Sequence, residues 1–349
     1  MPSVLLCLGI VAALLHNTDF SRACLRWLRN ALLLEFILLL AAAAVGAIYE
    51  RVSSARERRV SRPSGKLVDI GGYRLHLYCG GGSGPTVVLE HGLDGSYLDW
   101  FFVQPEVARF ARVCSYDRAG YGWSNASPRA RLPGVQADEL HALLERAGEK
   151  SPFVLVGHSM GAFDVLMYAH RYPKQVAGIV LVDGSHPEDE LPFRWNDKIW
   201  IRFMQLTASL GLPRWRKWCE GGPDEIRPLK RGFCYEPKVF NTQYRQWAAF
   251  SESAKQVKGL GSLGSLPLLV ISRDPQRSGG LGKKERDLRW QELQSDLTRL
   301  SSRSTEMVAQ RSGHNIPFDR PDVVVTGIRR IVEQARTEPG MERRSEPKR

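Results

Sequence analysis

The sequence predicts an α/β fold in which a mostly parallel β-sheet carries helices on both faces. Short runs of branched apolar residues alternate with helix-like segments along residues 67–337, and short loops join them. Strands of a parallel sheet are continuous apolar runs because helices cover both of their faces. The length agrees with this prediction, since 349 residues can hold one large domain of this kind together with additional segments.

The distribution of charge argues against a nucleic-acid-binding surface. The formal net charge is +12, but residues 51–66 carry six Arg or Lys against one Glu, and residues 329–349 carry seven against four Glu. Eight of the twelve excess charges therefore lie in two flanking segments rather than on one face of a fold. A patch beside a membrane explains the first segment and a solvated tail the second, so we expect no nucleic-acid partner.

The amino-terminal part predicts a membrane anchor. Residues 31–49 are apolar except for Glu35, which is close to the ~20 residues that span a bilayer. We therefore expect residues 1–50 to anchor the chain, with a span at about 31–49. A shorter apolar run at 4–15 fits a second span, an interfacial helix or the core of a signal peptide, although no Lys or Arg precedes it.

A basic linker is predicted over residues 51–66, because Pro63 and Gly65 stand near its end and the segment is polar. Cationic residues flank the span unequally. Three arginines precede it and five follow it, namely Arg22, Arg26 and Arg29 before, and Arg51, Arg56, Arg58, Arg59 and Arg62 after. The positive-inside rule therefore favours the cytoplasmic side for the domain that follows.

The six cysteines show no Cys-x-x-Cys spacing and no histidine partners, so the sequence predicts no metal site. Cys219 and Cys234 lie in one segment and are able to pair if the domain is outside the cytoplasm. The sequence leaves that pairing open.

The first part of the predicted core, residues 67–185, begins with a hairpin at Gly71-Gly72. The glycine-rich stretch at 80–84 is followed by Pro85 and a strand rather than by a helix, so we interpret it as a turn and not as a phosphate-binding loop. Strands and helices then alternate, with strands expected at 86–90, 112–116, 153–156 and 176–182 and helices at 97–109, 135–147 and 159–171.

The alternation stops over residues 186–263, which hold five of the nine tryptophans: Trp195, Trp200, Trp215, Trp218 and Trp247. We expect this segment to form a helical cap whose aromatic side chains line an apolar pocket. The core resumes at 264–337, with strands at 267–271 and 305–309, a helix at 283–300 and a last helix that opens at Pro321. A disordered tail is expected over 338–349.

The central motif is Gly157-His158-Ser159-Met160-Gly161, which follows the apolar run at 154–156 and precedes a helical pattern. A strand that turns sharply into a helix leaves no room for a Cβ at the two glycines. This strand–Gly-x-Ser-x-Gly–helix arrangement is a nucleophile elbow with serine at its apex. On this motif the chain resembles the serine hydrolases of the α/β-hydrolase superfamily, which include esterases and lipases, and the resemblance implies an α/β-hydrolase fold over residues 67–337.

The resemblance implies a catalytic triad in the chain order serine, acid, histidine. His314 follows the strand at 305–309 and is the expected general base, because ligands meet such sheets at the carboxyl edge. Asp274 follows the preceding strand, in the position that resembles the usual acid of the family, and we predict it as the triad acid. Asp183 ends the strand at 176–182 and stays as the alternative acid. Arg273 is a possible partner of the Asp274 carboxylate.

The resemblance also implies an oxyanion hole made of two backbone N–H groups. Met160 follows the nucleophile and supplies one of them. His91-Gly92-Leu93 resembles the His-Gly-x loop of the family, so Leu93 is the second candidate. His91 and His158 are expected to bond loop backbone nearby. The stretch 117–124 resembles the Asp-x-x-Gly-x-Gly-x-Ser loop of the family and is expected to shape the site floor.

The sequence therefore predicts a membrane-anchored serine hydrolase that cleaves a carboxylic ester or related acyl bond through an acyl-enzyme. No cofactor and no metal are implied, and the membrane and the aromatic cap suggest an apolar or lipid-like small-molecule acyl substrate. Aminopeptidase or thioesterase activity on the same triad is one alternative. A catalytically silent, membrane-tethered binding module is another, because one fold serves many activities.

Overall fold

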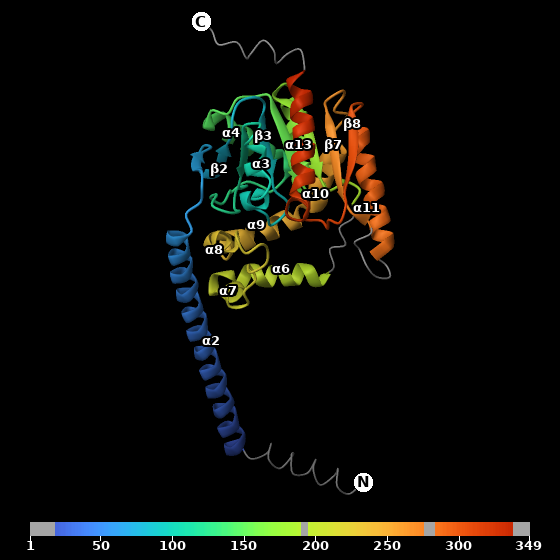
Figure 1. Ribbon diagram of the computed structural model, residues 1–349. Helices are drawn as coiled ribbons and strands as arrows, with labels where there is room; N and C mark the ends of the chain where they lie inside the picture. The colour runs from blue at the N-terminus through green and yellow to red at the C-terminus, as the bar shows by residue number, and fades with distance from the viewer. Residues whose placement is uncertain (1–17, 190–194, 276–282, 338–349) are drawn as a thin grey trace, which may run out of the picture.

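The computed structural model describes residues 18–189, 195–275 and 283–337. Figure 1 shows a sheet between two layers of helices, with a group of further helices on one side and one long helix extending away from the rest. The predicted apolar segment at 4–15 and the predicted tail at 338–349 lie outside the described residues.

Eight strands form one sheet in the order β1-β2-β4-β3-β5-β6-β7-β8. The first two strands form the predicted hairpin around Gly71-Gly72, and β1–β2 and β2–β4 are antiparallel while all other neighbours are parallel. The strands are β1 Lys66–Asp69, β2 Arg74–Gly80, β3 Thr86–Glu90, β4 Val113–Tyr116, β5 Phe153–His158, β6 Val176–Val182, β7 Leu268–Arg273 and β8 Ser304–Ala309. The prediction of a mostly parallel sheet in an α/β fold is confirmed.

Alternate strand residues bury on opposite faces of the sheet. Leu155 on β5 belongs to a core that α4 Pro133–Ala147 and α5 Gly161–Arg171 cover, whereas Val154 and Val156 belong to a core that α13 Pro321–Arg336 covers. This period of two follows from strand geometry, and because both faces are covered, β3 and β5 are buried throughout and β6 at all but one residue. Strands β3, β5 and β6 are therefore packed against side chains on both faces of the sheet.

Two predicted helices differ in detail from the structure. The segment predicted as one helix over 97–109 consists of a 3-10 turn, η1 Tyr97–Trp100, and a short helix, α3 Gln104–Val107. Pro105 stands near the start of α3 and has no N–H to donate to the preceding turn. The helix predicted over 283–300 ends three residues earlier, as α11 Lys283–Leu297. The 3-10 turn η5 Thr298–Leu300 follows it.

The segment between β6 and β7 is helical where it is described. Its elements are α6 Trp195–Thr207, η3 Ala208–Leu210, α7 Leu212–Trp215, α8 Arg227–Cys234, α9 Pro237–Ala248 and α10 Phe250–Lys258. A disulfide joins Cys219 to Cys234 within it, and a second disulfide joins Cys79 to Cys114 across the paired strands β2 and β4. Assignment of this segment as a cap stays a prediction.

The amino-terminal helix, α2 Thr18–Val60, is longer than the sequence predicted. The linker expected over 51–66 is wrong for residues 51–60, which continue the helix. The reason is a set of contacts: the Arg214 guanidinium bonds the carboxylates of Glu50 and Glu57 and the hydroxyl of Ser54, all on one face of α2. The residues from 22 to 60 hold an exposed apolar stretch long enough to be a candidate membrane span.

Candidate active site

Ser159 stands at the turn between β5 and α5 with a left-handed φ of 51°. A Cβ added to Gly157 would lie 2.7 Å from the carbonyl oxygen of Gly161, and one added to Gly161 would lie 2.7 Å from the carbonyl oxygen of His91. Real side chains do not tolerate such contacts, so both positions require glycine. The structure therefore confirms the sharp strand-to-helix turn, which points the Ser159 side chain out of the sheet edge.

Three side chains from three separate segments form a chain of hydrogen bonds at this edge. The Nε2 atom of His314 lies 2.9 Å from the Ser159 hydroxyl, and the Nδ1 atom lies 2.6 Å from a carboxylate oxygen of Asp183. Because a carboxylate only accepts, Nδ1 carries the proton and Nε2 accepts the hydroxyl proton of the serine. This arrangement is suited to deprotonating Ser159.

The prediction that Asp274 contacts His314 is wrong, because Asp183 occupies that place. Strand β6 pairs directly with β5, whereas β7 lies one strand further from Ser159, and neighbouring strands are ~4.8 Å apart. Asp274 instead accepts a hydrogen bond from the backbone N–H of Arg311 at 2.6 Å, and its own N–H donates to the carbonyl of Ser312. It therefore tethers the loop that leads to His314.

Asp183 is fully buried and accepts from several donors. The indole N–H of Trp290 donates to it at 2.8 Å, and Arg273 donates through its backbone N–H at 3.1 Å and its guanidinium at 3.2 Å. Burial by itself raises the pKa of this carboxyl, but the hydrogen bond and charge of His314, with Arg273 and Trp290, outweigh it and lower the pKa. Arg273 thus pairs with Asp183 and also with Asp287.

The loop after β3 lies against the serine. A Cβ on Gly92 would lie 3.2 Å from the Cβ of Ser159. The buried guanidinium of Arg118 donates to the carbonyl of Gly92 at 2.7 Å and to that of His91 at 2.6 Å. In a trans peptide the N–H points opposite to the C=O, so the Leu93 N–H points away from Arg118. Leu93 lines the same cavity as Ser159.

Met160 also lines that cavity and immediately precedes α5. The first N–H groups of a helix have no partner within the helix, and the helix dipole favours negative charge beside them. The two predicted backbone donors, Leu93 and Met160, are therefore brought to the same cavity as Ser159 and His314.

Both additional histidines bond backbone near the site, as the sequence predicted. Nδ1 of His91 lies 2.8 Å from the carbonyl of Gly92, and Nε2 of His158 lies 2.9 Å from the carbonyl of His314. Burial first, and then the charge of His314, lower the pKa of His158 to about 4. A neutral His158 is therefore able to donate its Nε2 proton and to hold the His314 backbone in place.

Sequence reasoning did not single out Arg118 or Trp290. Arg118 is buried and also ion-pairs with the carboxylates of Glu90 and Asp164. The signal for Arg118 was its place in the 117–124 loop, directly after a buried strand. No comparable signal marked Trp290, because it lies on α11, far along the chain from Asp183.

The cavity at the site has a volume of about 770 Å³. Its lining combines apolar side chains with both signs of charge. Besides Ser159, Ser185 and His314, it is lined by Leu93, Met160, Trp247, Phe250, Trp290 and Leu293, by Arg273, Arg286 and Arg289, and by Asp94, Glu188 and Asp189. Of the tryptophans in the 186–263 segment whose side chains are described, Trp247 lines this cavity, whereas Trp200, Trp215 and Trp218 are exposed on the outside.

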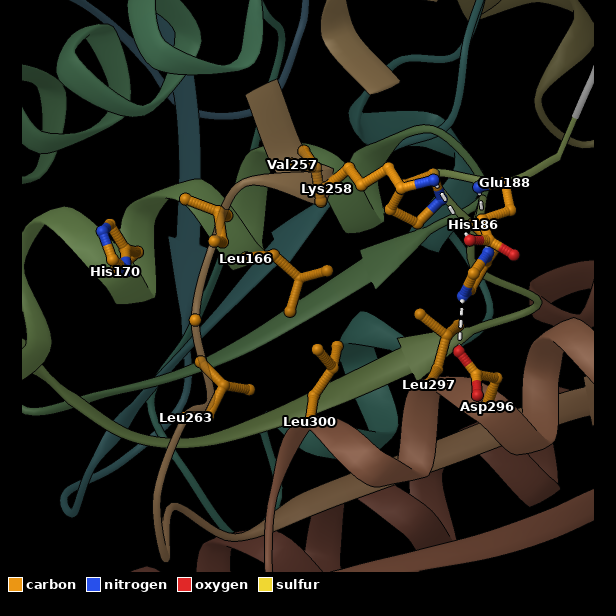
Figure 2. A pocket seen from close by; sticks show the side chains of 13 residues that line it. Leu166, His170, His186, Glu188, Val257, Lys258, Leu263, Asp296, Leu297 and Leu300 are labelled. Carbon is orange, nitrogen blue, oxygen red and sulfur yellow. Dashed lines mark hydrogen bonds and ion pairs between the residues drawn. The ribbon is translucent and has the colours of Figure 1, made fainter. Parts of the chain in front are cut away.

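A smaller cavity of about 170 Å³ lies between α5, α10 and the end of α11. Figure 2 shows its leucine side chains and the contact between His186 and Asp296, whose Nε2 and carboxylate oxygen lie 3.2 Å apart. His170 also lines it, and neither His170 nor His186 is among the residues that line the cavity of Ser159. Its lining holds no serine or cysteine, and the larger cavity is the candidate active site.

One group of potential metal ligands occurs among the described residues: Cys79, Cys114 and Glu149. Both thiols are used by the disulfide, and Glu149 accepts two hydrogen bonds from Arg112. This group therefore offers no thiolate to a metal ion.

The chain belongs to the alpha/beta hydrolase family, whose model matches residues 87–326. The fold and the family support a hydrolase. The uncharacterized protein YqjL of Bacillus subtilis is 28% identical over 265 residues, which cover 75% of this chain and 90% of that protein.

Solved structures show the same fold. An esterase from Thermogutta terrifontis matches with a TM-score of 0.59 and 21% identity, covering 79% of this chain and 100% of its own. The epoxide hydrolase CorEH matches with a TM-score of 0.57 and 19% identity, and the match covers 77% of this chain and 98% of CorEH. At these identities the likeness extends to the fold alone.

Proposed function

We propose that this protein is a membrane-anchored serine hydrolase that cleaves a carboxylic ester or related acyl bond through an acyl-enzyme. The observation that carries the proposal is the pair of short contacts at His314, 2.9 Å to Ser159 and 2.6 Å to Asp183. A serine hydroxyl becomes a useful nucleophile only when an oriented imidazole removes its proton.

The proposed reaction has two halves. The Ser159 oxygen attacks the acyl carbon and its proton passes to Nε2 of His314; the tetrahedral intermediate then expels the alcohol, which takes that proton. Water repeats the sequence on the acyl-enzyme, releases the acid and restores Ser159. Asp183 holds the His314 ring with its proton on Nδ1, and the N–H groups of Leu93 and Met160 stabilise the oxyanion in both halves.

The nucleophile distinguishes this proposal from epoxide hydrolysis. The superfamily's epoxide hydrolases and haloalkane dehalogenases carry aspartate at the elbow, where this chain has Ser159. Aminopeptidase and thioesterase activity use the same serine chemistry, so a screen of ester, thioester and aminoacyl-amide substrates separates the three.

The proposal of a membrane anchor rests on α2. Its most apolar stretch has a mean hydropathy of 2.5, and none of that stretch is buried by the rest of the protein. The distribution of arginines around the span predicted that the domain after α2 lies in the cytoplasm, but the two disulfides argue against that side of the membrane. Disulfides persist in oxidising compartments, and cytoplasmic thiols are kept reduced. We therefore propose that the domain after α2 lies on the oxidising side.

Labelling with a fluorophosphonate tests the nucleophile directly. We expect the full chain to form a covalent adduct that Ser159→Ala abolishes, with activity on a short-chain ester falling by several orders of magnitude. Ser185→Ala is a matched control in the same cavity and keeps the adduct. A folded wild-type chain with no Ser159-dependent adduct would favour the catalytically silent binding module.

A further inference from the structure

An apolar face on the 195–218 segment is unpartnered among the described residues. Ile199, Phe203 and Leu206 on α6 and Leu210 on η3 recur at intervals of four, three and four residues, and all are exposed, Leu206 by 61%. Residues at this spacing share one side of a helix. The opposite side of α6 is already used, because Met204 and Ala208 are buried against Phe240 of α9.

Aromatic side chains extend this face. The Trp200 ring stacks on Phe203 with centroids 5.9 Å apart and contacts Trp218 at 5.4 Å. Trp215 is 71% exposed. We use the term outer cap face for these residues, namely Ile199, Trp200, Phe203, Leu206, Leu210, Trp215 and Trp218. Exposed apolar side chains that gather on one side of a segment often mark an interaction site.

The outer cap face lies at the level where the apolar part of α2 ends. A Cβ on Gly46 of α2 would lie 2.3 Å from the carbonyl oxygen of Leu210, so the two backbones are in close contact there. Gly46 precedes the end of the predicted span at Tyr49 by three residues, or about 4.5 Å of helix. Figure 1 shows α6 beside α2 and roughly perpendicular to it, with α6 and α7 on the side of the folded domain toward the amino-terminal part of α2.

Hydrogen bonds and ion pairs, of which Arg214–Glu50 is buried, fix the position of the face relative to α2. Arg214 on α7 donates to Glu50 at 2.7 Å and to Ser54 at 2.9 Å, and Arg58 contacts Glu236 at 2.6 Å. Arg214 and Glu50 are both buried. If α2 spans a bilayer, these contacts hold the outer cap face at the bilayer surface.

The composition of the segment suits a lipid surface. Besides the buried Arg214, residues 195–218 contain four Arg or Lys and one Asp, interleaved with the exposed aromatic and aliphatic residues. Helices that lie in the plane of a membrane bury an apolar face ~5–10 Å into the boundary between headgroups and acyl chains, with cationic residues toward the headgroups. Tryptophan is favoured at that depth.

We propose that the outer cap face inserts into the interfacial region of the same bilayer that α2 crosses. The occupant of the face is therefore lipid, and the cap is a second membrane contact. This inference rests on the proposed span of α2, and it adds that the segment covering the candidate active site is in contact with lipid.

Site-directed spin labelling of the full chain in vesicles of phosphatidylcholine and phosphatidylglycerol tests this. Leu206→Cys, Leu39→Cys and Glu252→Cys are introduced one at a time, and labelled, in a chain that carries Cys7→Ser and Cys24→Ser. Leu39 lies in the apolar part of α2 and reports the span; Glu252 is exposed on α10 and is the aqueous control. Collision with oxygen reports lipid, and collision with a water-soluble nickel chelate reports water.

We expect labels at 206 and 39 to collide at least several-fold more with oxygen than with the nickel chelate, and the label at 252 to show the reverse. If the label at 39 collides mainly with oxygen and the label at 206 mainly with the nickel chelate, the span is supported and this inference is overturned. Water-like accessibility at 39 would remove the span and the inference together. A label at 206 shielded from both reagents would mean that protein covers the face, which also overturns the proposal.

Discussion

Two aspartates end neighbouring strands of one sheet, and their surroundings differ. Asp183, after β6, is fully buried, has a left-handed φ of 45° and accepts from His314, Trp290 and Arg273. Asp274, after β7, accepts from the Arg311 backbone in the loop that precedes His314. One carboxylate thus orients the imidazole and the other orients the loop that carries it, which teaches that position at a strand end does not by itself assign a role.

The largest expected difference is in turnover. Asp183→Asn replaces the carboxylate oxygen that keeps the proton on Nδ1 of His314 with an amide group that donates there, so we expect kcat on a short-chain ester to fall by ~10⁴. Asp274→Asn keeps that acceptor and should reduce kcat by less than ~10-fold. Fluorophosphonate labelling rates of the two purified variants provide an independent measurement. A larger loss in Asp274→Asn than in Asp183→Asn would reverse the two roles.

A smaller effect is expected when Asp183 loses one neutral donor. Trp290→Phe removes the indole N–H at 2.8 Å and leaves the buried carboxylate with an unmet hydrogen bond. Such groups cost about 1–3 kcal/mol, which should appear in the free energy of unfolding measured with urea. Trp215→Phe, at an exposed site, is the matched control and should change stability by less than about 0.5 kcal/mol. Equal effects in the two variants would contradict a supporting role for Trp290.

The smallest expected effect is the pH dependence of stability that Asp183 contributes. Its pKa is lowered in the folded chain from the ordinary value of 3.8. The ionised carboxylate therefore stabilises the fold above pH 3.8, and this contribution is lost as the pH falls through the lower folded pKa.

The free energy of unfolding of wild type and Asp183→Asn, measured between pH 2.5 and 7, checks this sign. The difference between them should be constant above about pH 5 and should shrink below it. A difference that grows as the pH falls would show that the carboxyl is destabilised in the folded chain. Asp224→Asn, at an exposed carboxyl, controls for the substitution itself.

Local sequence patterns were sufficient to predict the sheet, the strand-to-helix turn at Ser159 and the position of His314 beside it. Strands such as 86–90 and 176–182 have the bounds expected from their apolar runs, because a strand buried on both faces leaves a signal within five to seven residues. The turn at Gly157, Ser159 and Gly161 was also predictable, because a tight turn restricts which residues can stand at neighbouring positions of the chain.

The packing of the folded chain decided which acid meets His314, because the choice depends on which strand lies next to β5 rather than on any local pattern. It also decided that residues 51–60 continue α2, through contacts with Arg214 more than 150 residues away. The exposed tryptophans follow the same principle: spacing predicts a helix with aromatic residues, but which side of it is covered depends on neighbours from distant parts of the chain.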